Sequence, residues 1–395
     1  MPLTKRPFGM GRHDTGGGIP QLRRWVRRKL APIALAVAVV ALSTVLWIVE
    51  PVGGLSHPAS VALVFLWLLF LIVTLVAESR GFFADVEFAH ALALEGRGRL
   101  PEAERNYGHV IGHLRRARGE KSRELLRHSL LHRCYVLRDL GRLTEALRDA
   151  DELIPACDGG DDAGSINFAG VGRTARADIL MRLGDDRARE AFEDVIVRYA
   201  DHQDASVRQV AAFAINKLGT RLDESGDYVG ALATYDLAVY RFCDDPDPVI
   251  RSAVATAILN RGRAYRRMGQ PLEAVNEYER VIGTYANEDK ALSTVIWART
   301  DVGLCLTALG RFGEALDRFD EVLATGAHDP AWAHDLQVAK ALCGKGLALT
   351  QLGRTDEAQA LYEKVIASFR EDEAPAELRL ASEKVAALRE TTGEV

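Results

Sequence analysis

The residues in this chain best suited to chemistry form an acidic group near the C-terminal end. The stretch LGRFGEALDRFDEVL (309–323) holds Asp317, Asp320 and Glu321 close together. Grouped carboxylates can bind a metal ion or act as general acid and base. However, the chain has no nucleotide-binding, nucleophile-elbow or zinc-protease motif. Whether these acids do chemistry depends on the elements that position them, and on whether the stretch occurs once.

Two pairs of histidines could also bind a metal ion. His109 and His113, and likewise His128 and His132, are four residues apart, so each pair would share one face of a helix. Such a pair can chelate a metal when further ligands complete the site. The sequence offers no third ligand nearby. We therefore predict surface or packing roles for these histidines, and no metal or cofactor.

The distribution of charge argues against one class of partner. The chain of 395 residues has a formal net charge of −5, but residues 1–30 hold eight basic residues against Asp14. The remainder therefore carries about −12 and is a poor candidate for nucleic-acid binding. The five cysteines are dispersed, without a CxxC motif, which predicts free thiols in a reducing compartment.

Two apolar segments predict membrane-spanning helices. Residues 31–49 and 59–77 each run for nineteen residues without a charge, and a turn containing Pro and Gly joins them. As helices they would each be roughly 28 Å long, about the thickness of a hydrocarbon core. A cleaved signal peptide has a shorter apolar core. We therefore predict a transmembrane hairpin over residues 31–78.

Basic residues before the first apolar segment predict its direction. Five lie between positions 23 and 29, and such residues favour the cytoplasmic side. Because two spans return the chain to its starting side, both termini should be cytoplasmic. The excess of arginine, 41 of the 50 basic residues, is typical of bacteria with GC-rich genomes. We thus predict an inner-membrane protein whose basic tail, residues 1–30, is disordered.

The rest of the chain repeats one pattern seven times. A glycine recurs every 41 to 43 residues, with a leucine or tyrosine four residues before it and a small residue seven before it. An alanine follows it, then an aromatic residue in six copies, then an aliphatic one. Spacings of three and four residues predict a helix on each side of the glycine, whose positive φ permits a tight turn. The seven turn glycines are Gly98, Gly141, Gly184, Gly226, Gly269, Gly310 and Gly353.

This pattern resembles the tetratricopeptide repeat. NRGRAYRRMGQPLEAVNEYERVI (260–282) places Gly262, Gly269, Ala274 and Tyr278 in register with the family pattern. The usual period is 34 residues, so this chain is more similar to the long-period (about 42-residue) bacterial members. The resemblance implies an all-α fold: an α-solenoid of about seven helix-turn-helix repeats over residues 79–373, preceded by two transmembrane helices. In that setting 309–323 is the sixth copy, its acids face water, and the stretch is a packing unit.

Helix boundaries follow from capping residues. Asp with Pro after it is a strong start signal, and the expected starts are Asp204, Asp247 with Pro248, Asp289, and Asp329 with Pro330. These positions lengthen the first helix of each repeat rather than insert a loop. After the last repeat, Leu378, Ala381, Val385 and Leu388 share one helical face. This predicts a C-terminal capping helix and tail over residues 374–395.

The resemblance also indicates where a partner would bind. In tetratricopeptide arrays the first helices line the concave face, where partner segments dock. The residues so implied are Asn216, Lys217, Asn260, Arg263, Arg266, Arg267, Lys340 and Lys345. A basic strip of this kind suits an acidic peptide or a C-terminal carboxylate. Asp223, Glu224 and Asp301 lie among them and argue against a simple carboxylate clamp.

A second basic run follows the predicted membrane hairpin. It comprises Arg115, Arg116, Arg118, Lys121, Arg123 and Arg127. Such residues could contact anionic lipid headgroups, or they could form a solvated helix face. The sequence leaves both interpretations open and favours the second.

The most consistent function is a membrane-anchored cytoplasmic scaffold or adaptor that binds protein partners and is not an enzyme. The alternative is a sensor-effector, in which the solenoid senses a trigger and the hairpin forms a pore. The apolar segments contain no charged residue, which disfavours a conducting path.

Overall fold

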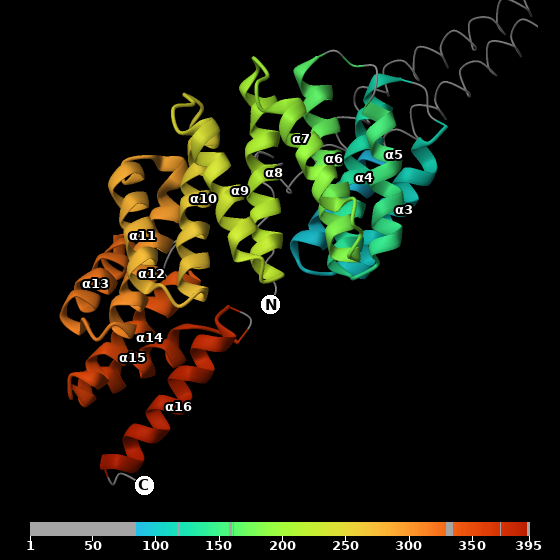
Figure 1. Ribbon diagram of the computed structural model, residues 1–395. Helices are drawn as coiled ribbons and strands as arrows, with labels where there is room; N and C mark the ends of the chain where they lie inside the picture. Colours follow the sequence, from blue (N-terminus) through green and yellow to red (C-terminus); the bar gives the residue numbers. More distant parts are fainter. Residues whose placement is uncertain are drawn as a thin grey trace, which may run out of the picture. The chain divides into compact units, whose positions relative to one another are not determined.

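The computed structural model describes residues 84–116, 119–157, 160, 162–328, 335–371 and 373–392. Helices dominate these ranges and no strand occurs in them, which confirms the predicted all-α class (Figure 1). The predicted tail 1–30 and the apolar segments 31–49 and 59–77 lie outside the described residues. Within the described ranges, no helix combines the length and the apolar character needed to cross a membrane.

The described chain divides after Cys157 into two compact units, and each is described by itself. The first unit begins with a helix over residues 84–96. It continues with α3 (Leu100–Leu114), α4 (Glu120–Asp139) and α5 (Leu143–Cys157). Ala91, Leu94, Ala103 and Tyr107 form part of its buried core.

The second unit is a solenoid of helix pairs. Its elements are α6 (Ala163–Leu183), α7 (Ala188–Tyr199), α8 (Ala205–Glu224), α9 (Tyr228–Phe242), α10 (Pro248–Arg267), α11 (Pro271–Tyr285), η2 (Asp289–Ala291), α12 (Leu292–Ala308), α13 (Phe312–His328), α14 (Leu336–Gln351), α15 (Thr355–Ser368) and α16 (Pro375–Thr392). We call α6, α8, α10, α12 and α14 the first helices and α7, α9, α11, α13 and α15 the second helices. As predicted, the first helix is the longer one in most pairs: α8 and α10 have 20 residues each, whereas α9 and α11 have 15. The pair α12 and α13 departs from this, because both helices have 17 residues.

The predicted turn glycines form the tight turns within the helix pairs of both units. All seven have φ between +71° and +87°. At Gly269, the amide of Gln270 donates to the carbonyl of Tyr265 at 2.9 Å, and the amide of Gly269 donates to Arg266 at 3.1 Å. These two bonds make a Schellman motif, which closes a helix with a left-handed residue. In the other six turns the equivalent acceptor is the leucine four residues before the glycine.

Aromatic residues of the second helices fill the space that small residues of the first helices leave. A Cβ on Gly262 would lie 2.5 Å from Cε1 of Tyr278, whose side chain is fully buried. In the stretch 309–323, Ala315, Phe319 and Val322 are likewise buried, so the predicted packing role of this stretch is confirmed. A Cβ on Gly303 or on Gly344 would meet the ring of Phe319, which therefore packs on both α12 and α14.

Two of the four expected helix starts are confirmed. Asp204 accepts the amide of Ser206 at 2.8 Å, and Asp247 accepts the amides of Val249 and Ile250. Asp329 and Pro330 lie outside the described residues, and α14 begins with Asp335 as its cap.

The expected start at Asp289 is wrong by two residues, since the N-cap of α12 is Ala291. The chain makes the 3₁₀ turn η2 at Asp289, and α12 begins at Leu292 without a capping side chain. The physical reason is that α10 holds this segment. Arg251 donates to the carboxylate of Glu288 at 3.0 Å, and Ser252 donates to the carbonyl of Lys290 at 2.8 Å.

The C-terminal helix α16 packs with the face that its sequence predicts. Ala381, Val385 and Leu388 are buried in one cluster with Tyr362 and Phe369. Leu378 packs against the same cluster. The apolar end of the last repeat is thereby covered.

Candidate partner-binding surface

The first helices of the second unit form a continuous row. Each packs on the next, from α6 through α8, α10 and α12 to α14. Each second helix instead packs on the first helix of its own pair and on the helix that follows it, which for α15 is α16. We call the side of the first helices turned away from the second helices the first-helix row; the helices can be followed in Figure 1.

Arg263 of α10 is held in place by two residues of α12. Its Nε donates to Oδ2 of Asp301 at 2.9 Å, and its guanidinium carbon lies 5.4 Å from the centroid of the Trp297 ring. The carboxylate of Asp301 is almost fully buried, whereas a quarter of the Arg263 side chain is exposed. The contact therefore joins two repeats and leaves one edge of the guanidinium open.

Similar Asp–Arg pairs join the neighbouring first helices, and we call this set the inter-repeat ladder. Arg267 of α10 pairs with Asp223 of α8, and Arg221 of α8 pairs with Asp178 of α6 at 2.7 Å. Both aspartates are buried. The predicted basic strip is therefore partly neutralised, because α8 and α12 provide carboxylates to two of its arginines.

The other predicted contact residues occupy different environments. Nδ2 of Asn216 donates to the carbonyl of Ala253 on the next first helix at 2.9 Å. Arg266 is exposed on α10. Lys345 pairs with Asp320 of α13, so it lies on the second-helix side of α14 and outside the first-helix row. Lys217, Asn260 and Lys340 are half-buried on α8, α10 and α14.

Sequence reasoning missed Trp297. This residue lies six positions before Gly303, and the matching positions in other repeats hold Phe213, Thr256 and Lys340. Aligning the repeats by their small first-helix residues could have placed Trp297 on the same face as the predicted residues. Its contact with Arg263 could not be anticipated, because it depends on how α10 and α12 pack.

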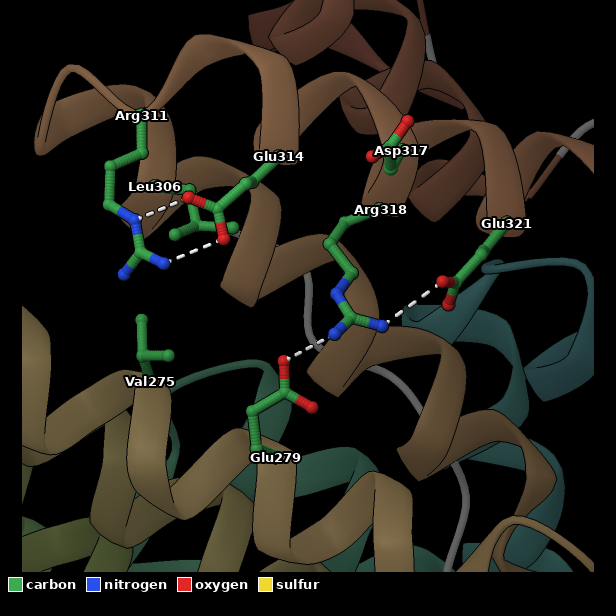
Figure 2. A pocket seen from close by; sticks show the side chains of 8 residues that line it. All are labelled: Val275, Glu279, Leu306, Arg311, Glu314, Asp317, Arg318 and Glu321. Carbon is green, nitrogen blue, oxygen red and sulfur yellow. Dashed lines mark hydrogen bonds and ion pairs between the residues drawn. The ribbon is translucent and has the colours of Figure 1, made fainter.

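Asp317 and Glu321 of the acidic group, together with Glu314, line a cleft on the second-helix side, shown in Figure 2. Asp320 lies outside this cleft and pairs with Lys345. The cleft lies between α11 and α13, and Leu306 of α12 contributes to its lining. Arg318 binds Glu279 at 2.9 Å and Glu321 at 3.0 Å, and Arg311 binds Glu314 at 2.6 Å. Hydrogen bonds from Arg311 lower the pKa of Glu314. The carboxylates predicted to be a solvated face thus mostly form ion pairs between and within repeats.

In the part of the chain that the structure describes, the groups that could do metal or nucleophilic chemistry do not assemble into a site. Among the described residues, no cluster of three or more His, Cys, Asp or Glu side chains could hold a metal ion. His109 and His113 are exposed, whereas Nδ1 of His132 lies 3.0 Å from Glu95 and its ring stacks on Tyr107. Burial raises the pKa of Cys305 to about 11, which disfavours the reactive thiolate.

Most of the predicted membrane-surface residues pair with acidic side chains of the first unit. Arg115 binds Glu152 at 2.7 Å, and Lys121 binds Asp85 at 2.8 Å. Arg123 and Arg127 share Glu120. Arg116 is exposed, and Arg118 lies outside the described residues.

Comparison with protein families identifies the repeats. Two family models described as tetratricopeptide repeat match residues 253–325 and 339–372. These two segments are similar to tetratricopeptide repeats. The first contains α11, α12 and most of α10 and α13, and it includes Arg263, Trp297 and Asp301. The second contains most of α14 and all of α15, which include Lys340. A comparison with the curated proteins finds no match to this chain.

Two solved structures with a TM-score of 0.50 show the same fold at low identity, and a third with a lower score is also similar. The apo form of RapI is 12% identical with a TM-score of 0.50, over 68% of this chain and 72% of that one. A signal-transduction ATPase with a tetratricopeptide repeat sensor, from Pyrococcus horikoshii, is 13% identical with a TM-score of 0.50, over 78% of this chain and 44% of that one. A tetratricopeptide repeat protein from Parabacteroides merdae is 14% identical with a TM-score of 0.42, over 76% of this chain and 98% of that one. Tetratricopeptide repeats generally mediate protein–protein interactions.

Proposed function

We propose that this chain is a membrane-anchored scaffold or adaptor that binds a protein partner on the first-helix row. The observation that carries the proposal is the unbroken row from α6 to α14. Arg266 and Lys340 lie on helices of that row, and no acidic side chain among the described residues forms an ion pair with either of them. Asn260 of α10 adds an uncharged polar side chain. The repeats would be of the long-period bacterial type, and catalysis has no part in the proposed role.

The proposed location is the cytoplasmic face of the bacterial inner membrane. It is supported by the two uncharged segments 31–49 and 59–77 and by the basic residues before the first of them. An anchor of this kind would concentrate the partner at the membrane surface, and the oligomeric state is left open by this proposal.

Labelling of cysteine can test the location. Cys243 is exposed, whereas the other four cysteines are buried. A membrane-impermeant maleimide should leave the protein unlabelled in intact spheroplasts and label it once they are permeabilised. Cys243→Ser is the control and should abolish the signal. Labelling in intact spheroplasts would contradict the cytoplasmic location.

Co-purification of the full-length chain can test the binding role. Arg266→Glu with Lys340→Glu should reduce recovery of the partner, since both residues lie on the first-helix row. Arg280→Glu is a matched control, because Arg280 is exposed on the second helix α11. If the double variant recovered as much partner as the wild type and the Arg280→Glu control do, binding on the first-helix row would be contradicted.

Replacing residues 31–78 with an unrelated hairpin separates the two roles considered for this segment. If the hairpin is only an anchor, the partner should still be recovered with the membrane fraction. If the hairpin is itself an effector that forms a pore, the replacement should abolish the pore activity while partner binding persists.

A further inference from the structure

The guanidinium of Arg263 is only partly used within the protein. Asp301 accepts from Nε, and the Trp297 ring lies against the guanidinium plane. Among the described residues, neither of the two terminal nitrogens has a hydrogen-bond acceptor. Because Asp301 is buried and α12 fixes both contacts, the open edge of the guanidinium is held in one orientation.

The surroundings of Arg263 add positive charge and polar groups. Asn260 and Arg266 are three residues before and after it on α10, so all three share one face of the helix. Arg266 is exposed. Within the described part of the chain, the one carboxylate that pairs with Arg263 is that of Asp301, which occupies the Nε side and leaves the terminal edge to another ligand.

Charge is also segregated between the two sets of helices in the second unit. Counting Lys, Arg, Asp and Glu within the helix bounds, the first helices carry +10 and the second helices carry −8. An acidic partner is therefore attracted to the first helices and repelled by the second.

We propose that Arg263 is a carboxylate-binding fork, and that the partner presents an aspartate or glutamate side chain to it. The inference rests on the proposed binding role of the first-helix row. Two parallel N–H donors match the two oxygens of a carboxylate, and this geometry is specific to arginine. The contacts with Asp301 and Trp297 reduce the conformational entropy that is lost on binding. Since α8 and α12 flank α10 on both sides, a segment lying along the row continues past the fork and meets it with a side chain.

A peptide library can test the assignment. The purified full-length chain in nanodiscs is exposed to random 12-residue peptides with amidated C termini, and the bound peptides are sequenced. The wild type should enrich peptides that contain Asp or Glu. Arg263→Lys keeps the charge but removes the fork, so it should bind a selected peptide about tenfold more weakly. Arg280→Lys should bind that peptide as the wild type does.

A double-mutant cycle sharpens the test. Changing the key Glu of the peptide to Gln should also weaken binding to the wild type about tenfold, and should have little further effect on Arg263→Lys. Melting of the variant, followed by circular dichroism, must match that of the wild type.

Peptides selected without acidic enrichment, or bound equally by Arg263→Lys, would overturn the fork and leave the binding role intact. Binding only of peptides with a free C-terminal carboxylate would overturn the side-chain assignment. Failure to select any peptide would overturn the binding role together with the fork.

Discussion

Tyr278 occupies the space that the absence of a side chain at Gly262 creates. The ring atom Cε1 would lie 2.5 Å from an added Cβ, far inside normal contact distance. Because Tyr278 is fully buried, its ring cannot move into solvent. The small residue and the aromatic residue in the repeat pattern are therefore two halves of one packing contact.

Gly262→Ala should lower the free energy of unfolding by about 1–3 kcal/mol, because the added methyl group overpacks this contact. Gly283→Ala is the matched control in the same repeat. It lies within α11, and an added Cβ would meet nothing within 4 Å. It should be neutral or slightly stabilising, since alanine favours helix. Urea unfolding followed by circular dichroism measures both, and equal effects would contradict the packing argument.

Asp185, the residue after a turn glycine, should make stability depend on pH. Hydrogen bonds from the side chain and the amide of Arg187 lower its pKa to about 2. A carboxylate whose pKa is lowered by folding stabilises the protein above its unfolded pKa, near 4. That contribution is lost as the pH falls through about 4 toward 2. Asp185→Asn should therefore lose less stability than the wild type between pH 6 and pH 2, measured by thermal unfolding.

Arg263 shows how far the site could be predicted from single residues. Its position on the first-helix row follows from the repeat register. Its orientation does not, because Asp301 and Trp297 come from the next repeat. The same limit applies to Lys345, which was expected on the row but pairs with Asp320 of a second helix.

At the scale of elements, the inter-repeat ladder ties the first helices together. Arg267 should matter more than a typical surface arginine, because it neutralises the buried carboxylate of Asp223 on α8. Arg267→Met should lower the free energy of unfolding by about 1–2 kcal/mol, since it leaves that carboxylate unpaired.

Arg354→Met is the control for Arg267→Met. Arg354, the N-cap residue of α15, pairs with Glu357 three residues further along the chain, and both side chains are about half exposed. Solvent screens such pairs, so little change in stability is expected. If both variants lost the same stability in urea unfolding, the ladder would have no special role.

The helices themselves were predictable because the same residue pattern occurs in seven copies. Spacings of three and four residues, a turn glycine and the leucine before it each recur, and the Schellman turns use all of them. The boundary at Asp289 failed because contacts from Arg251 and Ser252 override the local capping signal. Those contacts join residues almost forty positions apart, which local patterns cannot encode.

At the scale of the whole molecule, α16 should act as a capping helix that keeps the apolar end of the last repeat away from water. It buries Val385 and Leu388 against the last repeat. Deleting residues 374–395 would expose Tyr362, Val365 and Phe369, so the last repeat should lose roughly 3 kcal/mol or more. The deletion variant should unfold at lower urea and self-associate in light scattering. Glu383→Gln, on the exposed face of α16, should do neither.

Four of the five arginines of α10 bind carboxylates from elements on both sides of it. Arg267 binds Asp223, Arg261 binds Asp236 and Glu277, Arg251 binds Glu288, and Arg263 binds Asp301. The amide protons of α10 should therefore be the slowest in the second unit to exchange with deuterium, since opening α10 breaks all these pairs at once. Exchange should begin at the terminal repeats and reach α10 last, so the helix that carries the proposed carboxylate fork would also be the last part of the unit to open.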